Sequence, residues 1–476
     1  MNSKMPLWGA AAIVVGTLLL SWLIIPKLHR APKNTAEVAD QFPNDQFPST
    51  YKPLPSRPTI IRGATILTGT DQELTNASIL MQNGKVEAVG AKVPEPPNAV
   101  VIDGKGKFVT PGIIDIHSHL GVYPSPSEEA TQDGNEAVNP VTPYVRSENS
   151  VWPQDPGFTR ALAGGVTTLE ILPGSANLIG GRSVVLKNVP SRTTQGMKFP
   201  GAPYDLKMAC GENPKRVYGE KGGPQTWMGD VAGYRAAFEK AREYREKWRK
   251  YWRSGSKSDE PDRDIGLETL ALVLDKQIPV QMHCYRADQM ATMIDVAKEF
   301  GFRIAAFHHA TEAYKVADLL KQADICAVMW ADWWGFKMEA YDAVPEGIAM
   351  VDHAGACAMI HSDDPIGIQR LNQEVAKAMA AGRRMGYHIT RAHAVTWMTR
   401  NPAKALGILG QTGTLEKGKM ADVVMWDHDP LSVYAHAEKV FIDGALLYDR
   451  DNPKLSPRSD FEIGQEDNSN TGGAGQ

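Results

Sequence analysis

The sequence contains few cysteines, and those present follow no recognised pattern. Only four occur among 476 residues: Cys210, Cys284, Cys326 and Cys357. No pair has the short spacing of a CxxC metal or redox site, and four cysteines are too few for a dense disulfide framework. Each lies in a stretch typical of a strand or a helix, so we expect all four to be small, buried hydrophobic side chains.

Long basic runs and nucleotide-binding glycine motifs are also absent. The formal net charge is -4, which argues against a nucleic-acid-binding surface. No strand is followed by a dinucleotide-binding or P-loop glycine pattern. With 42% hydrophobic and 22% charged residues the composition is that of a globular protein, and the length predicts one large domain with a smaller one.

One long apolar run is present, near the N-terminus. Residues 6–25 carry no charge. A run of this length is about what is needed to cross a bilayer as a helix. The run ends in a poor cleavage site, so residues 1–26 are predicted to be a transmembrane anchor or an uncleaved signal. Positive charges flank both ends and do not fix the orientation. Because N-terminal segments of this kind are commonly export signals, we expect the body to be periplasmic or otherwise extracytoplasmic.

The remaining chain has two β-rich segments around a long alternating middle. Residues 57–110 and 406–450 contain β-branched runs broken by Asn-Gly and Asp-Gly, which are hairpin signals. Residues 111–405 alternate strand and helix patterns. This alternation predicts a parallel barrel or a doubly wound sheet, and the missing glycine fingerprint favours the barrel. The polar residues 27–56 are predicted to be a spacer and residues 451–476 a disordered tail.

Two histidines mark the end of the first strand in this alternating region. His117 and His119 are separated by one residue, so on a strand they point to the same face and can bind one metal ion together. They follow an apolar strand pattern from Phe108 to Ile116. This is the position at which a barrel strand reaches the catalytic face.

Later strand patterns end in further candidate ligands. His283 ends one apolar run, and His309 ends the next, 26 residues on. Asp363 follows a further apolar run about two strand–helix units beyond His309. Imidazoles and a carboxylate that come from separate barrel strands form a site suited to zinc, manganese or iron.

Four motifs resemble those of the amidohydrolase superfamily, specifically its imidazolonepropionase-like members. They are Thr110-Pro-Gly-Ile-Ile-Asp-Ile-His-Ser-His-Leu-Gly, Gly164-Gly-Val-Thr-Thr-Leu, Thr399-Arg-Asn-Pro-Ala-Lys-Ala-Leu-Gly and Gly413-Thr-Leu-Glu-Lys-Gly-Lys-Met-Ala-Asp-Val-Val. The resemblance covers residues 57–450. It implies an α/β fold, a distorted (β/α)8 TIM barrel with a small composite β-sandwich domain built from both chain ends.

The resemblance also implies roles for the strand-end residues. The metal ligands would be His117, His119, His283, His309 and Asp363. Asp363 would in addition be the general base, which takes a proton from the activated water and delivers it to the leaving nitrogen.

Two positions require a choice between neighbours. On a regular strand only one of His308 and His309 can face inward, and the sequence His309-Ala-Thr resembles the family's sixth-strand motif. His308 would then pack or hydrogen-bond behind the ligands. The family's Ser/Thr-Asp pattern selects Asp363 over Asp364, which is interpreted as a turn or capping residue.

The number of metal ions depends on Lys207. Binuclear members of the family carry a carboxylated lysine on the fourth strand, and Lys207 occupies that position. The alternative is a salt-bridged lysine or a substrate contact in a mononuclear site. Glu212 is an alternative second ligand or substrate-side group.

Residues just beyond the ligands are candidates for substrate binding. These are Tyr123, Arg286 and His361. The aromatic segment 330–339 is interpreted either as a wall of the pocket or as a packed barrel rim.

The leading functional hypothesis is hydrolysis of a carbon–nitrogen bond, other than an ordinary peptide bond, in a small amide or cyclic amide. The alternative within enzymes is a prolidase-like dipeptidase or carboxypeptidase. From another class, the alternative is an inactive membrane-anchored scaffold. The expected cofactor is one or two divalent ions, with zinc favoured. The expected partners are a small-molecule substrate, the membrane through the N-terminal helix, and a second copy of the chain.

Overall fold

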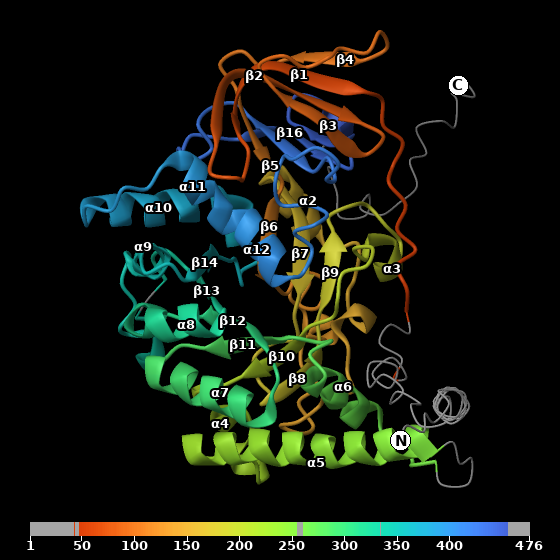
Figure 1. Cartoon of the computed structure of the whole chain (residues 1–476), viewed down its shortest axis with the longest axis vertical. Coiled ribbons are helices and arrows are strands. Elements are labelled where there is room, and N and C mark those ends of the chain that lie inside the picture. Colours follow the sequence, from red (N-terminus) through yellow and green to blue (C-terminus); the bar gives the residue numbers. More distant parts are fainter. Residues whose placement is uncertain (1–41, 43–46, 255–259, 334, 456–476) are drawn as a thin grey trace, which may run out of the picture. The chain divides into compact units, whose positions relative to one another are not determined.

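The structure, a computed structural model, describes residues 42, 47–254, 260–333 and 335–455 (Figure 1). The predicted anchor, most of the predicted spacer and nearly all of the predicted tail lie outside these residues. No helix in the described ranges combines the length and the apolar character that a membrane span needs.

The chain divides into two compact units. The smaller comprises residues 1–44 and 246–262, and the larger comprises residues 45–245 and 263–476. Every described strand lies in the larger unit. The long helix α5 (Trp227–Ser254) runs through both.

Strands from both ends of the chain form one eight-stranded sheet. Its order is β17-β16-β15-β5-β1-β2-β3, with β4 paired to β1. The strands are β1 (Thr59–Leu67), β2 (Glu73–Gln82), β3 (Lys85–Gly90), β4 (Val100–Asp103), β5 (Phe108–Pro111), β15 (Val423–Trp426), β16 (Ala437–Ile442) and β17 (Ala445–Asp449). The link between the two ends is the antiparallel pairing of β15 with β5.

The hairpins of this sheet turn where the sequence predicts. Asn83 and Gly84 connect β2 to β3 with φ of 53° and 76°, and Asp443 and Gly444 connect β16 to β17 with φ of 47° and 72°. Both central residues of such a turn need positive φ, which Asn, Asp and Gly tolerate best. The predicted Asn-Gly and Asp-Gly turns are therefore confirmed.

The middle of the chain forms two further sheets. One has the order β14-β13-β12-β11-β10-β8, and the other β6-β7-β9. The bounds are β6 (Ile113–Ser118), β7 (Val166–Ile171), β8 (Ile179–Arg182), β9 (Val184–Lys187), β10 (Leu206–Ala209), β11 (Val280–Cys284), β12 (Ile304–His309), β13 (Cys326–Met329) and β14 (Cys357–Ile360). Strands β10 to β14 run parallel to one another, as do β6 and β7.

These two sheets meet at both ends without closing into one continuous ring. Ser183 lies between β8 and β9, so the chain passes there directly from one sheet to the other. At the other end the backbone N–H of Asp363, just after β14, donates to the carbonyl of His117 in β6 at 3.0 Å. Within the described residues, the strands of the predicted distorted (β/α)8 barrel thus form two separate sheets.

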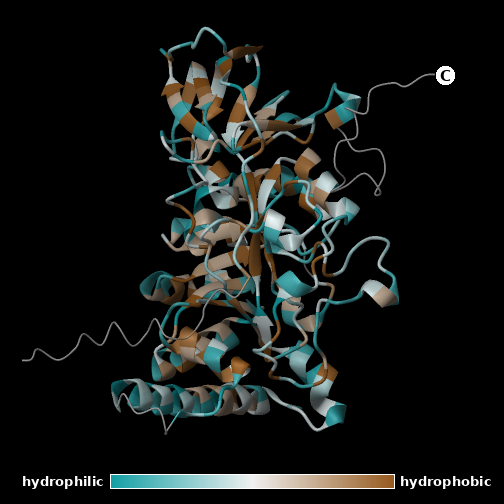
Figure 2. Cartoon of the chain, turned by 90° about the vertical axis from the view of Figure 1, so that its right-hand side faces the viewer, coloured by the Kyte–Doolittle hydropathy of each residue, from teal (hydrophilic) through white to brown (hydrophobic). Residues whose placement is uncertain are grey.

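Helices alternate with the parallel strands. They are α2 (Pro156–Ala163), α3 (Thr194–Met197), α4 (Glu212–Tyr218), α6 (Ile265–Leu274), α7 (Ala287–Phe300), α8 (Ala317–Ala323), α9 (Gly347–His353), α10 (Leu371–Arg384), α11 (Arg391–Val395) and α12 (Arg400–Ala405). Helices α7 to α10 lie along one side of β11 to β14 (Figure 1). In Figure 2 the strands inside are hydrophobic, and the helices and loops around them are more hydrophilic.

Helix α7 illustrates how the sequence produces this layer. Met290, Met293, Ile294 and Ala297 recur at helical spacing and are all buried, so they form the face that packs on the strands. The helix ends at Phe300 and is followed by Gly301, whose φ of 80° is the left-handed conformation that terminates many helices.

The expectation for the cysteines is wrong. Cys210 is disulfide-bonded to Cys284, and Cys326 to Cys357. Cys326 and Cys357 lie side by side on the neighbouring parallel strands β13 and β14, and Cys210 lies just after β10, next to the end of β11 that carries Cys284. Sequence separations of 74 and 31 residues conceal this proximity, because it arises only when the sheet forms.

Candidate metal centre

The first part of the site lies at the end of β6. Every residue of this strand is buried, and the side chain of His117 has no exposed surface. His119 lies just beyond the strand with 15% of its side chain exposed. The Nε2 atoms of the two rings are 3.3 Å apart. The structure therefore directs both predicted ligands to one point.

Asp363 completes this group from β14. Its Oδ1 lies 3.4 Å from Nε2 of His117 and 3.1 Å from Nε2 of His119. Burial raises the pKa of Asp363. The hydrogen bond with His119 and the positive charges nearby lower this pKa by more than burial raises it, so the pKa lies below its usual value. The carboxyl group is therefore ionised at neutral pH.

Both histidines at the end of β12 face the site. The regular strand ends at His309, which has φ of 67° and is followed by Ala310 with φ of 38°, so the alternation of a regular strand does not decide which of the two side chains faces inward. His308 places its Nδ1 2.9 Å from Nδ1 of His117 and its Nε2 2.8 Å from Oε1 of Gln281.

His309 has different surroundings. Its Nδ1 lies 4.0 Å from Oδ2 of Asp363 and has no hydrogen-bond partner in the described structure. The ring is close to those of His283 and Trp330, with centroids 4.5 and 4.6 Å away. A buried imidazole nitrogen without a partner is costly, so His309 is available to a metal ion.

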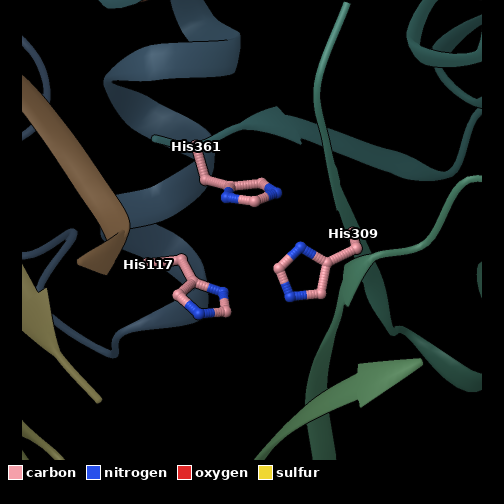
Figure 3. Close-up of side chains that lie close together, drawn as sticks. All are labelled: His117, His309 and His361. Carbon is pink, nitrogen blue, oxygen red and sulfur yellow. The ribbon is translucent and has the colours of Figure 1, made fainter. Parts of the chain in front are cut away.

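A second group of potential ligands contains His361. One nitrogen from each of His117, His309 and His361 lies within 4.8 Å of the others, and Figure 3 shows the three rings converging from β6, β12 and the end of β14. His361 is fully buried, and neither ring nitrogen has a hydrogen-bond partner among the described residues. From the sequence, His361 is predicted to be a substrate contact, whereas in the structure it lies within this group.

His283 and Lys207 approach from β11 and β10. His283 is 2% exposed and its Nδ1 has no partner among the described residues. Lys207 is fully buried; its Nζ donates to the carbonyl of Pro173 at 3.0 Å and lies 3.4 Å from Nε2 of His117. Burial lowers the pKa of Lys207 to about 8.

The donor set fits a divalent metal ion. Burial lowers the pKa of the four deeply placed imidazoles well below 6.5, so they are neutral at physiological pH; they are His117, His283, His308 and His309. Neutral imidazole is the form that binds zinc. Ring nitrogens of His283, His309 and His361 have no hydrogen-bond partner within the described part of the chain, and the ionised Asp363 lies close to this group.

A cavity of about 440 Å³ opens over this centre. His119, His283, His309 and Asp363 line it on the side of the ligands. The other lining residues are Tyr123, Asn135, Gly174, Ser175, Glu212, Asn213, Arg216, Tyr285, Phe336 and Lys337. This volume admits a small molecule rather than a folded chain.

The remaining predicted substrate contacts occupy different positions. Tyr123 lines the cavity, with its ring 5.6 Å from that of His119 and its hydroxyl donating to Asn135 at 2.8 Å. Arg286 instead pairs with Asp288 at 2.9 Å and lines a neighbouring cavity of about 450 Å³. Glu212 borders both cavities.

The aromatic segment forms part of the site's wall. Trp330 lies 5.2 Å from Trp333 and 5.9 Å from Phe336, measured between ring centroids, and 4.6 Å from His361. Its indole N–H donates to the carbonyl of Ser362 at 3.1 Å. The side chain therefore covers the candidate ligands on the side of β13.

Residues 108–447, well over half of the chain, match the family model for the amidohydrolase family. The chain therefore belongs to this family, a class of hydrolases that act on carbon–nitrogen bonds.

Individual relatives agree with this class. The chain is 34% identical over 431 residues to the amidohydrolase tasK of Hapsidospora irregularis, an alignment that covers 83% of this chain and 43% of that protein. This chain thus spans less than half the length of that relative. It is 23% identical over 375 residues to the imidazolonepropionase of Mesorhizobium japonicum, which covers 74% of this chain and 86% of that enzyme.

A solved structure supports the fold. The crystal structure of an amidohydrolase from Thermotoga maritima matches with a TM-score of 0.76 and 37% identity, over 82% of this chain and 100% of that one. The likeness assigns a TIM-barrel-like α/β fold to this chain.

Proposed function

We propose that the protein hydrolyses a carbon–nitrogen bond, other than an ordinary peptide bond, in a small amide or cyclic amide through metal-activated water. The observation that carries this proposal is the convergence of neutral, buried imidazoles with the ionised Asp363 beneath a cavity of about 440 Å³. The family membership supports the reaction type.

The chain's own residues divide the chemistry between them. His117, His119 and Asp363 form one ligand group, and His117, His309 and His361 form another, with His283 and Lys207 beside them. A bound divalent ion supplies Lewis acidity, which activates water and polarises the scissile carbonyl. Asp363 accepts a proton through its partly exposed carboxylate and passes it to the leaving nitrogen.

We propose further that Lys207 becomes carboxylated and holds a second ion. A pKa of about 8 leaves part of the buried amine neutral at physiological pH, and the neutral amine is the form that captures carbon dioxide. With bicarbonate present, the protein should bind about two ions per chain and Lys207→Ala about one, measured by elemental analysis. Equal metal content in both would contradict this role.

The main test is turnover by metal-reconstituted protein. Zinc, manganese and iron forms should be assayed with lactams, other small cyclic amides, N-acetylated sugars and Xaa-Pro dipeptides. His117→Ala and Asp363→Ala should abolish turnover. Lys417→Met, which replaces an exposed lysine, is the control and should leave turnover unchanged. Metal-free protein with full activity would exclude the proposal.

A prolidase-like dipeptidase is the second candidate. The observation that favours it is the exposed cationic side chain of Arg216 in the cavity wall, because a dipeptide carries a free carboxylate. Preferential turnover of dipeptides over cyclic amides would select this candidate.

We also propose a distorted (β/α)8 barrel and an extracytoplasmic location. The hydrogen bond from Asp363 to His117 supports the barrel, since it links the last parallel strand to the first. Two disulfides support the location, since such bonds persist mainly in oxidising compartments. Protease digestion of the body in intact cells tests the location, because a cytoplasmic body would stay protected until lysis.

A further inference from the structure

Helix α4 presents two charged residues to the metal cavity. Glu212 and Arg216 are four residues apart, so they lie on the same face of this helix, and both line the cavity that contains His119 and Asp363. Helix α4 follows β10, the strand of Lys207. The charged face is therefore attached to an element that carries a candidate ligand.

The other cation of the cavity is already neutralised. Nζ of Lys337 lies 3.1 Å from Oε1 of Glu339 and 3.4 Å from Oε1 of Glu212, and 4.2 Å from the centre of the Tyr285 ring. Only 17% of the Lys337 side chain is exposed. Its two carboxylate neighbours leave it little capacity to bind an anionic substrate.

Arg216 has no such compensation. It is exposed at the cavity wall and makes no ion pair or side-chain hydrogen bond with any residue in the described ranges. A guanidinium group offers five N–H donors in a planar fork that matches a carboxylate with two parallel hydrogen bonds. One wall of the cavity thus presents a guanidinium group without an ion-pair partner among the described residues, and the candidate metal ligands lie in the same cavity.

We propose that Arg216 binds a carboxylate group of the substrate, so that the substrate class is a small amide bearing a free carboxylate. This inference rests on the proposed function, since it assigns the substrate of the same site. Arg286, which pairs with Asp288 and lines the neighbouring cavity, is not this receptor.

The test compares each ligand with its uncharged analogue. N-acetyl derivatives of glycine, leucine, phenylalanine, proline and glutamate, each as the free acid and as the α-carboxamide, are titrated into the zinc-loaded protein by calorimetry and assayed for turnover. For at least one free acid, Arg216→Met should weaken binding by about 10- to 100-fold, and Arg216→Lys by less, because lysine keeps the charge but not the fork. Binding of carboxamides should change less than about twofold.

Arg384→Met provides the matched control, since it removes an exposed arginine at the end of α10. It should leave all affinities unchanged. The proposal is overturned if no free acid binds, if acids bind no better than carboxamides, or if Arg216→Met weakens both equally. Arg216-dependent binding without hydrolysis of any carbon–nitrogen substrate would instead contradict the proposed function and leave the carboxylate site intact.

Discussion

At the scale of the residue, the two adjacent histidines at the end of β12 have separate roles. His308 contacts His117 and Gln281 through its two ring nitrogens, and Gln281 in turn donates from Nε2 to Asp205 at 3.0 Å. This chain of contacts fixes the orientation of the His117 ring. His309 has an unpartnered Nδ1 and stands in the candidate ligand group.

Substitution of each histidine should separate these roles. His308→Ala should weaken zinc binding by about 10- to 100-fold, the usual effect of losing a partner that orients a ligand. His309→Ala should weaken it further, because a ligand itself is removed. Competition with a chromophoric chelator measures both affinities. A larger loss in His308→Ala than in His309→Ala would reverse the assignment.

The sequence predicts most positions of the site because barrel strands deliver their last residues to one face. This rule places His117, His283 and Asp363 without coordinates. It does not anticipate that β12 ends in a left-handed residue and so directs two neighbours inward. It also does not assign His361 to the ligand group, although this residue directly follows β14, as His119 directly follows β6.

At the scale of the element, the disulfides tie parallel strands together at different levels. Cys284 is the last residue of β11 and follows His283, and Cys210 comes just after β10. This bond therefore lies at the ends of the strands that carry the site. Cys326 and Cys357 are the first residues of β13 and β14, at the opposite ends of their strands.

Removal of the two disulfides should have different effects on the site. Each Cys-to-Ala double substitution should lower the free energy of unfolding by about 2–5 kcal/mol. Only the loss of Cys210–Cys284 should also weaken zinc binding, because the residue next to His283 then loses its covalent link to the end of β10. Denaturant unfolding and chelator competition measure the two quantities. Unchanged zinc affinity in both variants would show that the Cys210–Cys284 disulfide does not support the site.

A second element-scale feature joins the loop between β1 and β2 to α9. Nδ1 of His393 lies 2.7 Å from Oδ1 of Asp71, and its Nε2 lies 2.9 Å from Oδ2 of Asp352. Arg400 also contacts Asp71, and the indole N–H of Trp397 donates to Asp352 at 2.9 Å. The hydrogen bond to Asp352, followed by the charges of the two carboxylates, raises the pKa of His393 above 6.5.

This raised pKa makes stability depend on pH. Charged His393 stabilises the folded state fully below pH 6.5, the pKa expected in the unfolded chain, and the contribution disappears as the pH rises through the higher folded-state pKa. His393→Gln should therefore destabilise the protein at pH 6 and much less at pH 9. Urea midpoints across this range measure the effect. An equal loss of stability at pH 6 and pH 9 would mean that the charge of His393 contributes nothing to stability.

At the scale of the whole molecule, the two ends of the chain are joined by a buried ionic cluster. Nζ of Lys187, in β9, lies 2.6 Å from Oδ2 of Asp443 and 3.2 Å from Oδ1 of Asp422, and the hydroxyl of Tyr51 donates to Asp443 at 2.5 Å. The sequence predicts β-rich segments at both chain ends from their turns. It cannot predict this cluster, because its members are separated by up to 392 residues.

Lys187 should therefore stabilise the packing of the eight-stranded sheet against the three-stranded sheet β6-β7-β9. Lys187→Met leaves two carboxylates buried without their cation, which should lower the free energy of unfolding by about 3–5 kcal/mol. Lys417→Met removes a lysine that is 73% exposed and paired with Glu87, and should cost less than about 1 kcal/mol. Adding Asp443→Leu to Lys187→Met should recover part of the loss, since one unpaired charge disappears. Urea unfolding of the four proteins measures these differences, and equal values for the two lysine variants would exclude a structural role for the cluster.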